Sequence, residues 1–320
     1  MIDRSQEEIM KNWPKDLDTP LVSIRSLVYN QEKYIAQALD GFLMQQTNFP
    51  FEIVVHDDAS TDKTANIIRD YEAKYPQIIK PIYETENQYS KHDGSLSRAI
   101  NSGCRGKYIA LCEGDDYWTD AFKLQKQLDF LKEHPDYSMC FHRAKIKYEK
   151  GYGDCALKCD DIENREYKPD EFLTKWIAPT ASIMSKRECL FYEIKNLTHV
   201  LNGDVFFILK CSALGKIYGM SDYMSVYRVH EGGVTYHPSI QRERTMKYPL
   251  HFECILENFP NAAPKYIKRK IAETYFDRAK IQPSVKEAFK DYAKAFAASR
   301  RIFFRMTKNS IKSNVKKLFV

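Results

Sequence analysis

Two hydrophobic patterns alternate over roughly the first 115 residues of the chain. Short apolar runs predict four strands, at residues 21–29, 51–55, 78–83 and 107–112. Between them, apolar positions three and four residues apart predict helices at residues 32–46, from Ile67 to Tyr75, and at residues 95–104. Strands that alternate with helices indicate a mostly parallel α/β sheet flanked by helices.

Beyond residue 120 the pattern is mixed. It predicts strands at residues 137–148, 180–186 and 216–229 and a helix at residues 204–214. Residues 149–175 are polar and irregular, so we expect a loop there. From about residue 240 to the end the spacing is helical, which predicts a helical C-terminal extension.

Two acidic pairs come directly after predicted strands. Asp57-Asp58 follows the second strand and Asp115-Asp116 follows the fourth. In a parallel sheet the carboxyl ends of the strands share one edge, and ligands bind there. We therefore expect both pairs at the same edge of one sheet.

The turn of Glu113, Gly114, Asp115 and Asp116 has the chemistry of a metal site. Adjacent carboxylates suit Mg²⁺ or Mn²⁺, and such a cation neutralises the charge that grows on a leaving diphosphate. Gly114 lets the backbone approach a ligand closely. The alternative is that the two aspartates cap a helix beginning near Thr119.

The segment from Asp57 to Asp62 also has two interpretations. Ser60 and Asp62 are good candidates for capping the next helix. Asp58 is not needed for that, and a carboxylate at a strand end can accept the N3–H of a uracil ring, which cytosine lacks.

Three further residues are candidates for the chemistry. Asp204 lies where a helix is expected to begin, so it is either an N-cap or a general base that takes a proton from a sugar hydroxyl. Arg98 is either a clamp for a diphosphate or a solvated helix residue. His230, after the last strand, is either a metal ligand or a structural histidine.

One dinucleotide-binding pattern is discarded. Residues 151–156 (GYGDCA) match G-x-G-x-x-G/A, but no strand precedes them and no amphipathic helix follows.

Composition narrows the class of protein. The formal net charge of +6 over 320 residues is mild, so it does not by itself argue for nucleic-acid binding, and we expect no such partner. The eight cysteines form no zinc pattern and several lie in apolar runs, which predicts reduced core cysteines and a cytosolic protein. No signal peptide or membrane-spanning run is expected.

Residues 285–320 combine aromatic side chains with many cations. A basic amphipathic helix can lie on an anionic membrane, which predicts peripheral contact with the inner face of the cell membrane. The alternative is a helix that packs on the rest of the protein and turns a basic face to solvent.

Four segments, in this order along roughly residues 20–235, make the chain resemble the family 2 glycosyltransferases of the GT-A fold. The blocks are LVSIRSLVYNQEKYIAQALDGFLMQQ, FEIVVHDDASTDKT, SLSRAINSGCRGKYIALCEGDDYWTDAFKLQKQLDFL and NGDVFFILKCSALGKIYGMSDYMSVYRVHEGG. The resemblance implies a Rossmann-like mixed sheet. It also implies an enzyme that uses a nucleotide-sugar donor.

The resemblance also assigns roles to residues. Asp58 matches the aspartate that contacts the nucleotide base, and Tyr29 lies in the first motif of that pocket. Arg98 matches an arginine before the metal motif, although Ala99 replaces the asparagine that usually follows.

The remaining matches concern the metal and the reaction. Asp115 and Asp116 match the metal motif, with Asp116 as the direct ligand of Mn²⁺ or Mg²⁺ and Asp115 beside the donor. His230 matches a histidine that reaches the metal or diphosphate in some relatives. Asp204 matches the catalytic base, which implies a single in-line displacement with inversion.

These expectations combine into one prediction. Residues 1–235 form the glycosyltransferase domain, with a nucleotide-binding half at about 20–118 and an acceptor half at about 119–235, and residues 236–320 form the extension. The predicted reaction moves a sugar, from UDP by preference, to a saccharide or lipid-linked acceptor in cell-surface polysaccharide synthesis. A nucleotidyltransferase or phosphotransferase, or a non-catalytic glycan-binding protein, remains an alternative.

Overall fold

A computed structural model describes residues 2–15, 19–149, 159, 161–230 and 241–318 of the chain. It divides into two compact units. The first consists of Met1–Tyr192 and Phe207–Gly232, and the second of Glu193–Phe206 and Gly233–Val320. The domain boundary predicted at residue 235 falls outside the described residues and stays a prediction.

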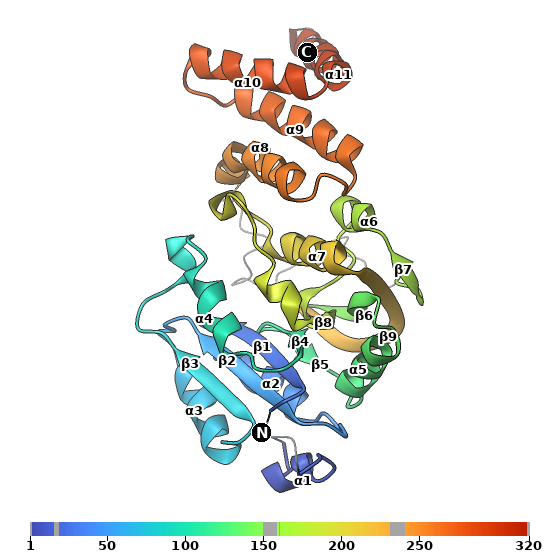
Figure 1. Ribbon diagram of the computed structural model, residues 1–320. Helices are drawn as coiled ribbons and strands as arrows, with labels where there is room; N and C mark the ends of the chain where they lie inside the picture. Colours follow the sequence, from blue (N-terminus) through green and yellow to red (C-terminus); the bar gives the residue numbers. More distant parts are fainter. Residues whose placement is uncertain (1, 16–18, 150–158, 160, 231–240, 319–320) are drawn as a thin grey trace. The chain divides into compact units, whose positions relative to one another are not determined.

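Nine strands of the described residues form one sheet in the first unit (Figure 1). Its parallel half has the order β3 (Ile79–Tyr83), β2 (Phe51–Asp57), β1 (Val22–Val28) and β4 (Tyr108–Leu111). The sheet continues through β8 (Met184–Lys186), β6 (Tyr137–Tyr148), β9 (Lys216–Val229) and β5 (Tyr117–Trp118), and β7 (Arg165–Tyr167) pairs with β9. β8 is antiparallel to β4 and β6, so the sheet is mixed as expected.

Helices bury apolar side chains on both faces of this sheet. One core receives the apolar faces of α2 (Ile35–Leu43), α3 (Thr64–Lys74) and α5 (Lys123–Glu133). A second core receives α4 (Ser95–Gly103), α6 (Pro169–Thr174) and the later part of α7 (Gly203–Leu214). The short α1 (Gln6–Met10) adds Ile9 to the first core.

A glycine sets the close approach of α2 to β5. A Cβ on Gly41 would lie 2.9 Å from the backbone nitrogen of Trp118, so a larger residue would push the two elements apart. Beside it the rings of Phe42 and Trp118 meet edge to face at 4.8 Å. This packing fixes β5, which begins directly after Asp116.

The second unit contains α8 (Gln241–Asn258), α9 (Pro264–Ala279), α10 (Val285–Ala298) and α11 (Arg300–Leu318). Buried residues of α9, including Ile267 and Tyr275, form much of its interior. Arg278 donates two hydrogen bonds, of 2.6 and 2.8 Å, to the two carboxylate oxygens of Asp291 and joins α9 to α10. The helical C-terminal extension is therefore confirmed.

Most predicted elements are present, with two corrections. Residues 149–175 are not all loop, because β7 and α6 form within them; residues 150–158 and 160, which include the discarded glycine pattern, are outside the described part. No helix begins near Thr119: β5 follows the acidic turn, and α5 begins only at Lys123. The helix-cap interpretation of Asp115 and Asp116 is therefore wrong.

Two expectations from composition agree with the structure. The seven described cysteines are buried. None of the described helices combines the length and the apolar character needed to cross a membrane.

Candidate functional site

The two acidic pairs lie at one edge of the sheet. β1 and β2 end side by side, with Val28 opposite Asp57. The backbone nitrogen of Asp58 donates to the carbonyl of Val28 at 2.9 Å, and that of Gly114 donates to the carbonyl of Leu27 at 3.2 Å. Both acidic segments are thus joined to the carboxyl end of β1, as the strand pattern predicts.

Arg228 of β9 holds the acidic turn in place. Its backbone nitrogen donates to Oδ1 of Asp116 at 2.8 Å, and its guanidinium donates to the carbonyl oxygen of Asp115 and to Oε1 of Gln37. The guanidinium also lies 4.4 Å from the ring centroid of Tyr117. The antiparallel pairing of β5 with β9 brings these residues together across more than a hundred positions of sequence.

His230 joins the same cluster. Its Nε2 lies 3.0 Å from Oδ2 of Asp115, and its ring lies 4.6 Å from that of Tyr34. The structure therefore brings His230 into contact with Asp115, the residue that precedes Asp116 in the acidic turn.

The carboxylate of Asp116 is buried next to a second carboxylate, that of Asp115. Asp116 is 2% exposed. Burial raises the pKa of Asp116 well above its usual range and the neighbouring charge of Asp115 raises it further, against the opposing hydrogen bond from the backbone of Arg228. A divalent cation would supply the positive charge that keeps both carboxylates ionised.

The donor atoms at this turn fit a hard divalent cation. Asp115 and Asp116 offer carboxylate oxygens and His230 a ring nitrogen. Oε1 of Gln31 is buried without a hydrogen-bond partner, and a Cβ on Gly114 would come within 2.5 Å of it.

The protein ligands alone do not complete such a site. Within the described ranges no three His, Cys, Asp or Glu side chains converge to enclose a cation. Mg²⁺ is commonly held by one or two carboxylates and completed by the phosphates of a substrate. The arrangement thus suits a cation that arrives with, or is completed by, a diphosphate.

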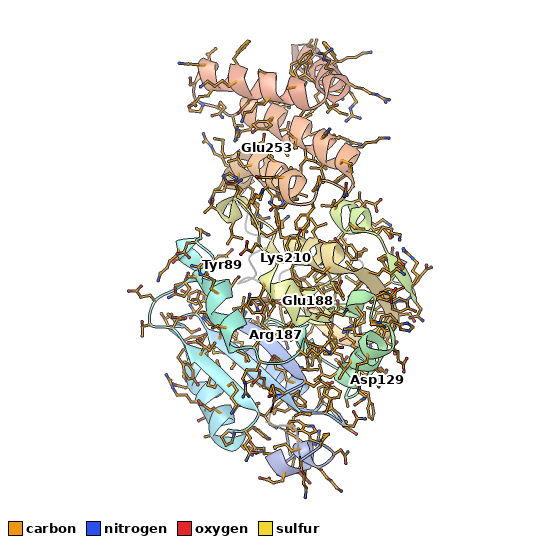
Figure 2. All side chains as sticks on the ribbon, in the orientation of Figure 1. Tyr89, Asp129, Arg187, Glu188, Lys210 and Glu253 are labelled. Carbon is orange, nitrogen blue, oxygen red and sulfur yellow. The ribbon has the colours of Figure 1, made fainter. Side chains whose placement is uncertain are left out.

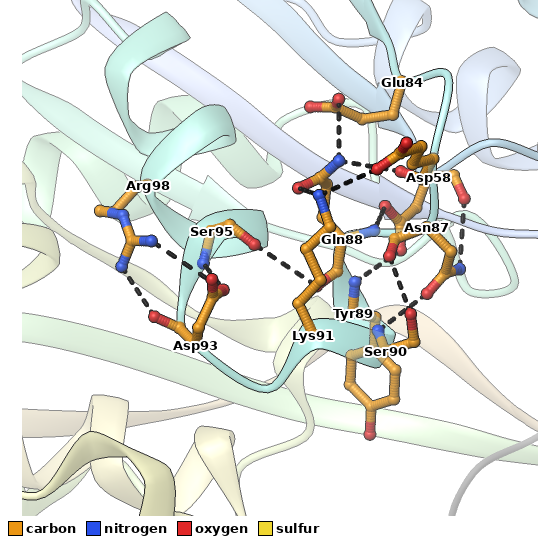
Figure 3. A network of polar contacts seen from close by, with 11 residues as sticks. Asp58, Glu84, Asn87, Gln88, Tyr89, Ser90, Lys91, Asp93, Ser95 and Arg98 are labelled. Carbon is orange, nitrogen blue, oxygen red and sulfur yellow. Dashed lines mark hydrogen bonds and ion pairs between the residues drawn. The ribbon is translucent and has the colours of Figure 1, made fainter.

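The carboxylate of Asp58 accepts hydrogen bonds from the backbone of residues 88–89 (Figure 3). Its Oδ1 accepts from the backbone nitrogen of Gln88 at 2.6 Å and its Oδ2 from that of Tyr89 at 3.0 Å. Asn87 also donates to the Asp58 carbonyl at 3.3 Å. A carboxylate has about four acceptor directions, so a base contact remains open to it. That contact stays a prediction.

Tyr29 and Arg98 are also predicted to bind the donor, but among the described residues neither contacts the acidic turn. Tyr29 follows β1 and is half exposed. Arg98 lies on α4 with its side chain 65% exposed, and its guanidinium donates to the carbonyl of Asp93 at 2.8 Å (Figure 3). Among the described residues, its hydrogen bonds and ion pair go to Asp93, so its role as a clamp stays a prediction.

Asp204 belongs to the second unit. α7 begins one residue earlier, at Gly203, so Asp204 is a first-turn residue and not the N-cap. Its Oδ1 accepts from the backbone nitrogen of Val205 at 2.8 Å.

Sequence reasoning missed Arg228, Gln31 and Gln37. A signal for Arg228 existed: residues alternate faces along a strand, so Arg228 lies on the same face as His230, two positions later. The two glutamines carry no comparable signal, because their importance depends on contacts made in three dimensions.

Comparison with known proteins identifies the class. The model of glycosyl transferase family 2 matches residues 23–185. The chain belongs to this family.

Curated relatives extend the match. An uncharacterized protein of Mycobacterium tuberculosis is 39% identical over 213 residues, which are 67% of this chain and 60% of the relative. The putative teichuronic acid biosynthesis glycosyltransferase TuaG of Bacillus subtilis is 35% identical over 126 residues, 39% of this chain and 45% of that protein. The chain thus spans about three fifths of the length of its mycobacterial relatives.

Solved structures share the fold. TarS 1-349 of S. aureus in complex with UDP-GlcNAc matches with a TM-score of 0.60 and 20% identity, over 88% of this chain and 82% of that one. The mannosyltransferase PcManGT from Pyrobaculum calidifontis in complex with GDP-Man and Mn2+ matches with a TM-score of 0.55 and 19% identity, over 94% and 84%. The predicted GT-A architecture is confirmed.

Proposed function

We propose that this protein is an inverting glycosyltransferase that takes its sugar from a nucleotide diphosphate, with a UDP-sugar as the preferred donor. The observation that carries the proposal is the turn of Asp115 and Asp116 in a family 2 chain, where Arg228 binds the buried carboxylate of Asp116 and His230 contacts Asp115. Structures of the same fold are complexes with UDP-GlcNAc and with GDP-Man, which supports a nucleotide-sugar donor.

The cation of the proposal is Mn²⁺ or Mg²⁺. Asp116 is the direct ligand, and Asp115 and His230 lie beside it. When bound, the cation supplies Lewis-acid neutralisation of the departing diphosphate. Arg228 contributes by fixing the backbone and side chains of the turn before the donor arrives.

The nucleoside end of the donor is assigned to the first half of the sheet. Asp58 accepts the N3–H of uracil while it continues to hold the segment around Gln88 and Tyr89. Tyr29 lines the same pocket, and Arg98 approaches the diphosphate by leaving Asp93. Selection of uracil over cytosine follows from the acceptor character of Asp58, because cytosine has no proton at N3.

Asp204 is the proposed catalytic base. It takes the proton of an acceptor hydroxyl as the hydroxyl oxygen attacks the anomeric carbon from the face opposite the diphosphate. The bond to the diphosphate oxygen breaks in the same step, so the configuration inverts. This role rests on family membership and on the match of the Gly203-Asp204 segment.

The acceptor is proposed to be a saccharide or a lipid-linked saccharide in cell-surface polysaccharide synthesis, and the sugar a hexose or N-acetylhexosamine. The similarity to TuaG, a putative teichuronic acid biosynthesis glycosyltransferase, supports this setting. A lipid-linked acceptor would place the protein on the cytoplasmic side, at the inner face of the membrane.

The C-terminal helices support membrane contact. Val285 and Phe289 of α10 are 88% and 73% exposed, and Phe304 and Ile311 of α11 are also exposed. Cations accompany these side chains along both helices. Exposed apolar residues among cations suit an anionic membrane surface. Phe289→Ser with Phe304→Ser should release the protein from phosphatidylglycerol vesicles in co-sedimentation; unchanged sedimentation would count against the contact.

The function is tested by measuring nucleotide release. Purified protein with Mn²⁺ is offered UDP-glucose, UDP-GlcNAc and GDP-mannose, with and without a glycan acceptor. Release of UDP that depends on the acceptor and disappears in Asp204→Asn supports the proposal. Release of pyrophosphate would favour a nucleotidyltransferase, and glycan binding without any release would favour a non-catalytic protein.

A further inference from the structure

A cavity of about 470 Å³ lies at the amino edge of the sheet, the edge opposite the acidic turn. Its walls form where Leu21 precedes β1, Lys107 precedes β4, Lys186 ends β8 and Arg187 follows it. The backbone nitrogen of Tyr108 donates to the carbonyl of Leu21 at 3.0 Å, and that of Arg187 donates to the carbonyl of Lys107 at 2.9 Å. The walls are therefore fixed to the sheet.

The cavity is separate from the candidate donor site. β1 has seven residues and runs from one edge to the other. At a rise of about 3.3 Å per residue, the two edges are roughly 20 Å apart. A donor bound at the acidic turn does not fill this cavity.

Positive charge dominates the lining. Arg105 is neutralised by the buried carboxylate of Glu52, with its Nη2 and Nε at 2.7 and 2.9 Å from Oε2. Lys107, Lys186 and Arg187 have no carboxylate within 4.0 Å among the described residues. These three cations against the one carboxylate of Glu188, which also lines the cavity, leave a net charge of +2.

Two of the cations are held ready for a ligand. Nε of Arg187 donates to the carbonyl of Cys104 at 2.9 Å, and its guanidinium lies 4.8 Å from the ring centroid of Phe191. These contacts orient the guanidinium while leaving its two terminal nitrogens available. Nζ of Lys186 donates to the carbonyl of Pro135 at 2.6 Å, which limits its motion. A pre-oriented group loses less entropy when it binds.

We propose that this cavity binds a phosphate monoester at a second site, distinct from the nucleotide-sugar site. The terminal nitrogens of Arg187 match the geometry of two phosphate oxygens, and Lys107 and Lys186 act as point charges beside it. The net charge of +2 balances a phosphate monoester, which carries nearly two negative charges at pH 7. The volume exceeds that of a phosphate alone and suits a phosphate carried on a sugar-sized body. Figure 2 labels Arg187 and Glu188 in the segment after β8.

Titration calorimetry on the full chain tests the site. Glucose 6-phosphate, inorganic phosphate and uncharged glucose are titrated separately, with Mg²⁺ and saturating UDP present so that donor-site binding does not contribute. Saturable binding of glucose 6-phosphate without binding of glucose is expected. Lys107→Gln with Arg187→Gln should weaken it by at least about tenfold, because two charge-assisted contacts are lost.

A matched control removes the same charge elsewhere. Lys132 and Lys145 are exposed and lie outside the cavity, so Lys132→Gln with Lys145→Gln should leave binding unchanged. Equal weakening in the control, or wild-type protein that binds neither glucose 6-phosphate nor phosphatidic acid vesicles, overturns the proposal. Lys107→Gln alone provides a test without disturbing the bond from Arg187 to Cys104, and should still weaken binding severalfold.

A second arm separates two sources of the phosphate. Vesicles with phosphatidic acid, whose headgroup is also a phosphate monoester, are compared with phosphatidylcholine vesicles by co-sedimentation. Vesicle binding lost in Lys107→Gln, without glucose 6-phosphate binding, assigns the ligand to a lipid headgroup; the reverse assigns it to a soluble metabolite. UDP binding by the cavity variants, measured in parallel, reports on the nucleotide site independently of this one.

Discussion

Replacing Arg228 tests whether the acidic turn is held as the structure indicates. Arg228→Gln keeps the backbone nitrogen that donates to Asp116 but removes a guanidinium whose side chain is 2% exposed. The lost contacts are the hydrogen bonds to the Asp115 carbonyl and to Gln37, and the packing over the rings of Tyr34 and Tyr117, at 5.0 and 4.4 Å. A longer ion pair with Glu149, at 3.8 Å, is also lost.

The expected cost follows from these contacts. A hydrogen bond from a charged group contributes about 1.5–3 kcal/mol, and a cation over an aromatic ring about 0.5–2 kcal/mol. The desolvation of a buried guanidinium opposes these gains. We therefore expect Arg228→Gln to lower the free energy of unfolding by about 2–4 kcal/mol.

The assay is urea unfolding followed by tryptophan fluorescence. Lys126→Gln is the control, because Lys126 makes exposed ion pairs with Asp120 and Asp222, at 2.7 and 3.0 Å, and should change stability by less than about 1 kcal/mol. A loss below about 1 kcal/mol for Arg228→Gln, or a loss equal to that of the control, would show that the guanidinium does not hold the turn.

The same variant has an electrostatic consequence. The charge of Arg228 is among the influences that lower the pKa of Asp116 against burial and Asp115. Without it, Asp116 keeps its proton to a higher pH, so the acid limb of the activity profile should move upward. An acid limb at the same pH in the wild type and the variant would show that the charge of Arg228 does not affect the ionisation of Asp116.

Three further predictions concern the acidic turn, the core and the second unit. Gly114→Ala puts a Cβ 2.5 Å from Oε1 of Gln31, so it should weaken Mn²⁺-dependent binding of UDP severalfold in titration calorimetry. Burial lowers the pKa of Lys123 to about 7, so the unfolded chain binds the extra proton from about pH 7 to 10. Stability relative to Lys123→Met should therefore rise across that range by up to about 1.4 kcal/mol per pH unit, and a flat difference would refute the shift. Burial acts to raise the pKa of Asp291. The hydrogen bonds to its carboxylate, of which that from Arg278 has the largest effect, outweigh burial and bring the pKa below its usual range. Asp291→Asn should lower the melting temperature at pH 7, and its effect should shrink as the pH falls through the lowered pKa and the wild-type carboxylate takes up a proton.

The sequence predicted the strands well where each had enough residues to show its pattern. The runs at 137–148 and 216–229 match β6 and β9 in both bounds. β7 has three residues, two of them charged, so no periodicity reveals it. It forms because β9 offers it an edge to pair with, and that is a tertiary condition.

The same distinction applies to the candidate site: residues placed by strand ends could be predicted, and residues placed by the pairing of distant strands could not. Asp58 and the Asp115-Asp116 pair could be placed at one edge because strand ends are visible in the sequence. The function of Arg228 could not, because β5 must pair with β9 before its side chain meets the turn. The hydrogen bonds that Asp58 accepts from Gln88 and Tyr89 were missed for a similar reason. The donors are backbone amides, which leave no pattern in the sequence.

Binding of UDP to the wild type and to Asp116→Asn, with and without Mn²⁺, tests the central claim most directly. Asp116→Asn preserves the size of the side chain and an oxygen that can accept from the Arg228 backbone, but removes the charge that a cation needs. The account predicts UDP binding that requires Mn²⁺ in the wild type and is lost in the variant. Equal, Mn²⁺-independent binding of UDP by both proteins would contradict a metal-dependent nucleotide-sugar site at this turn.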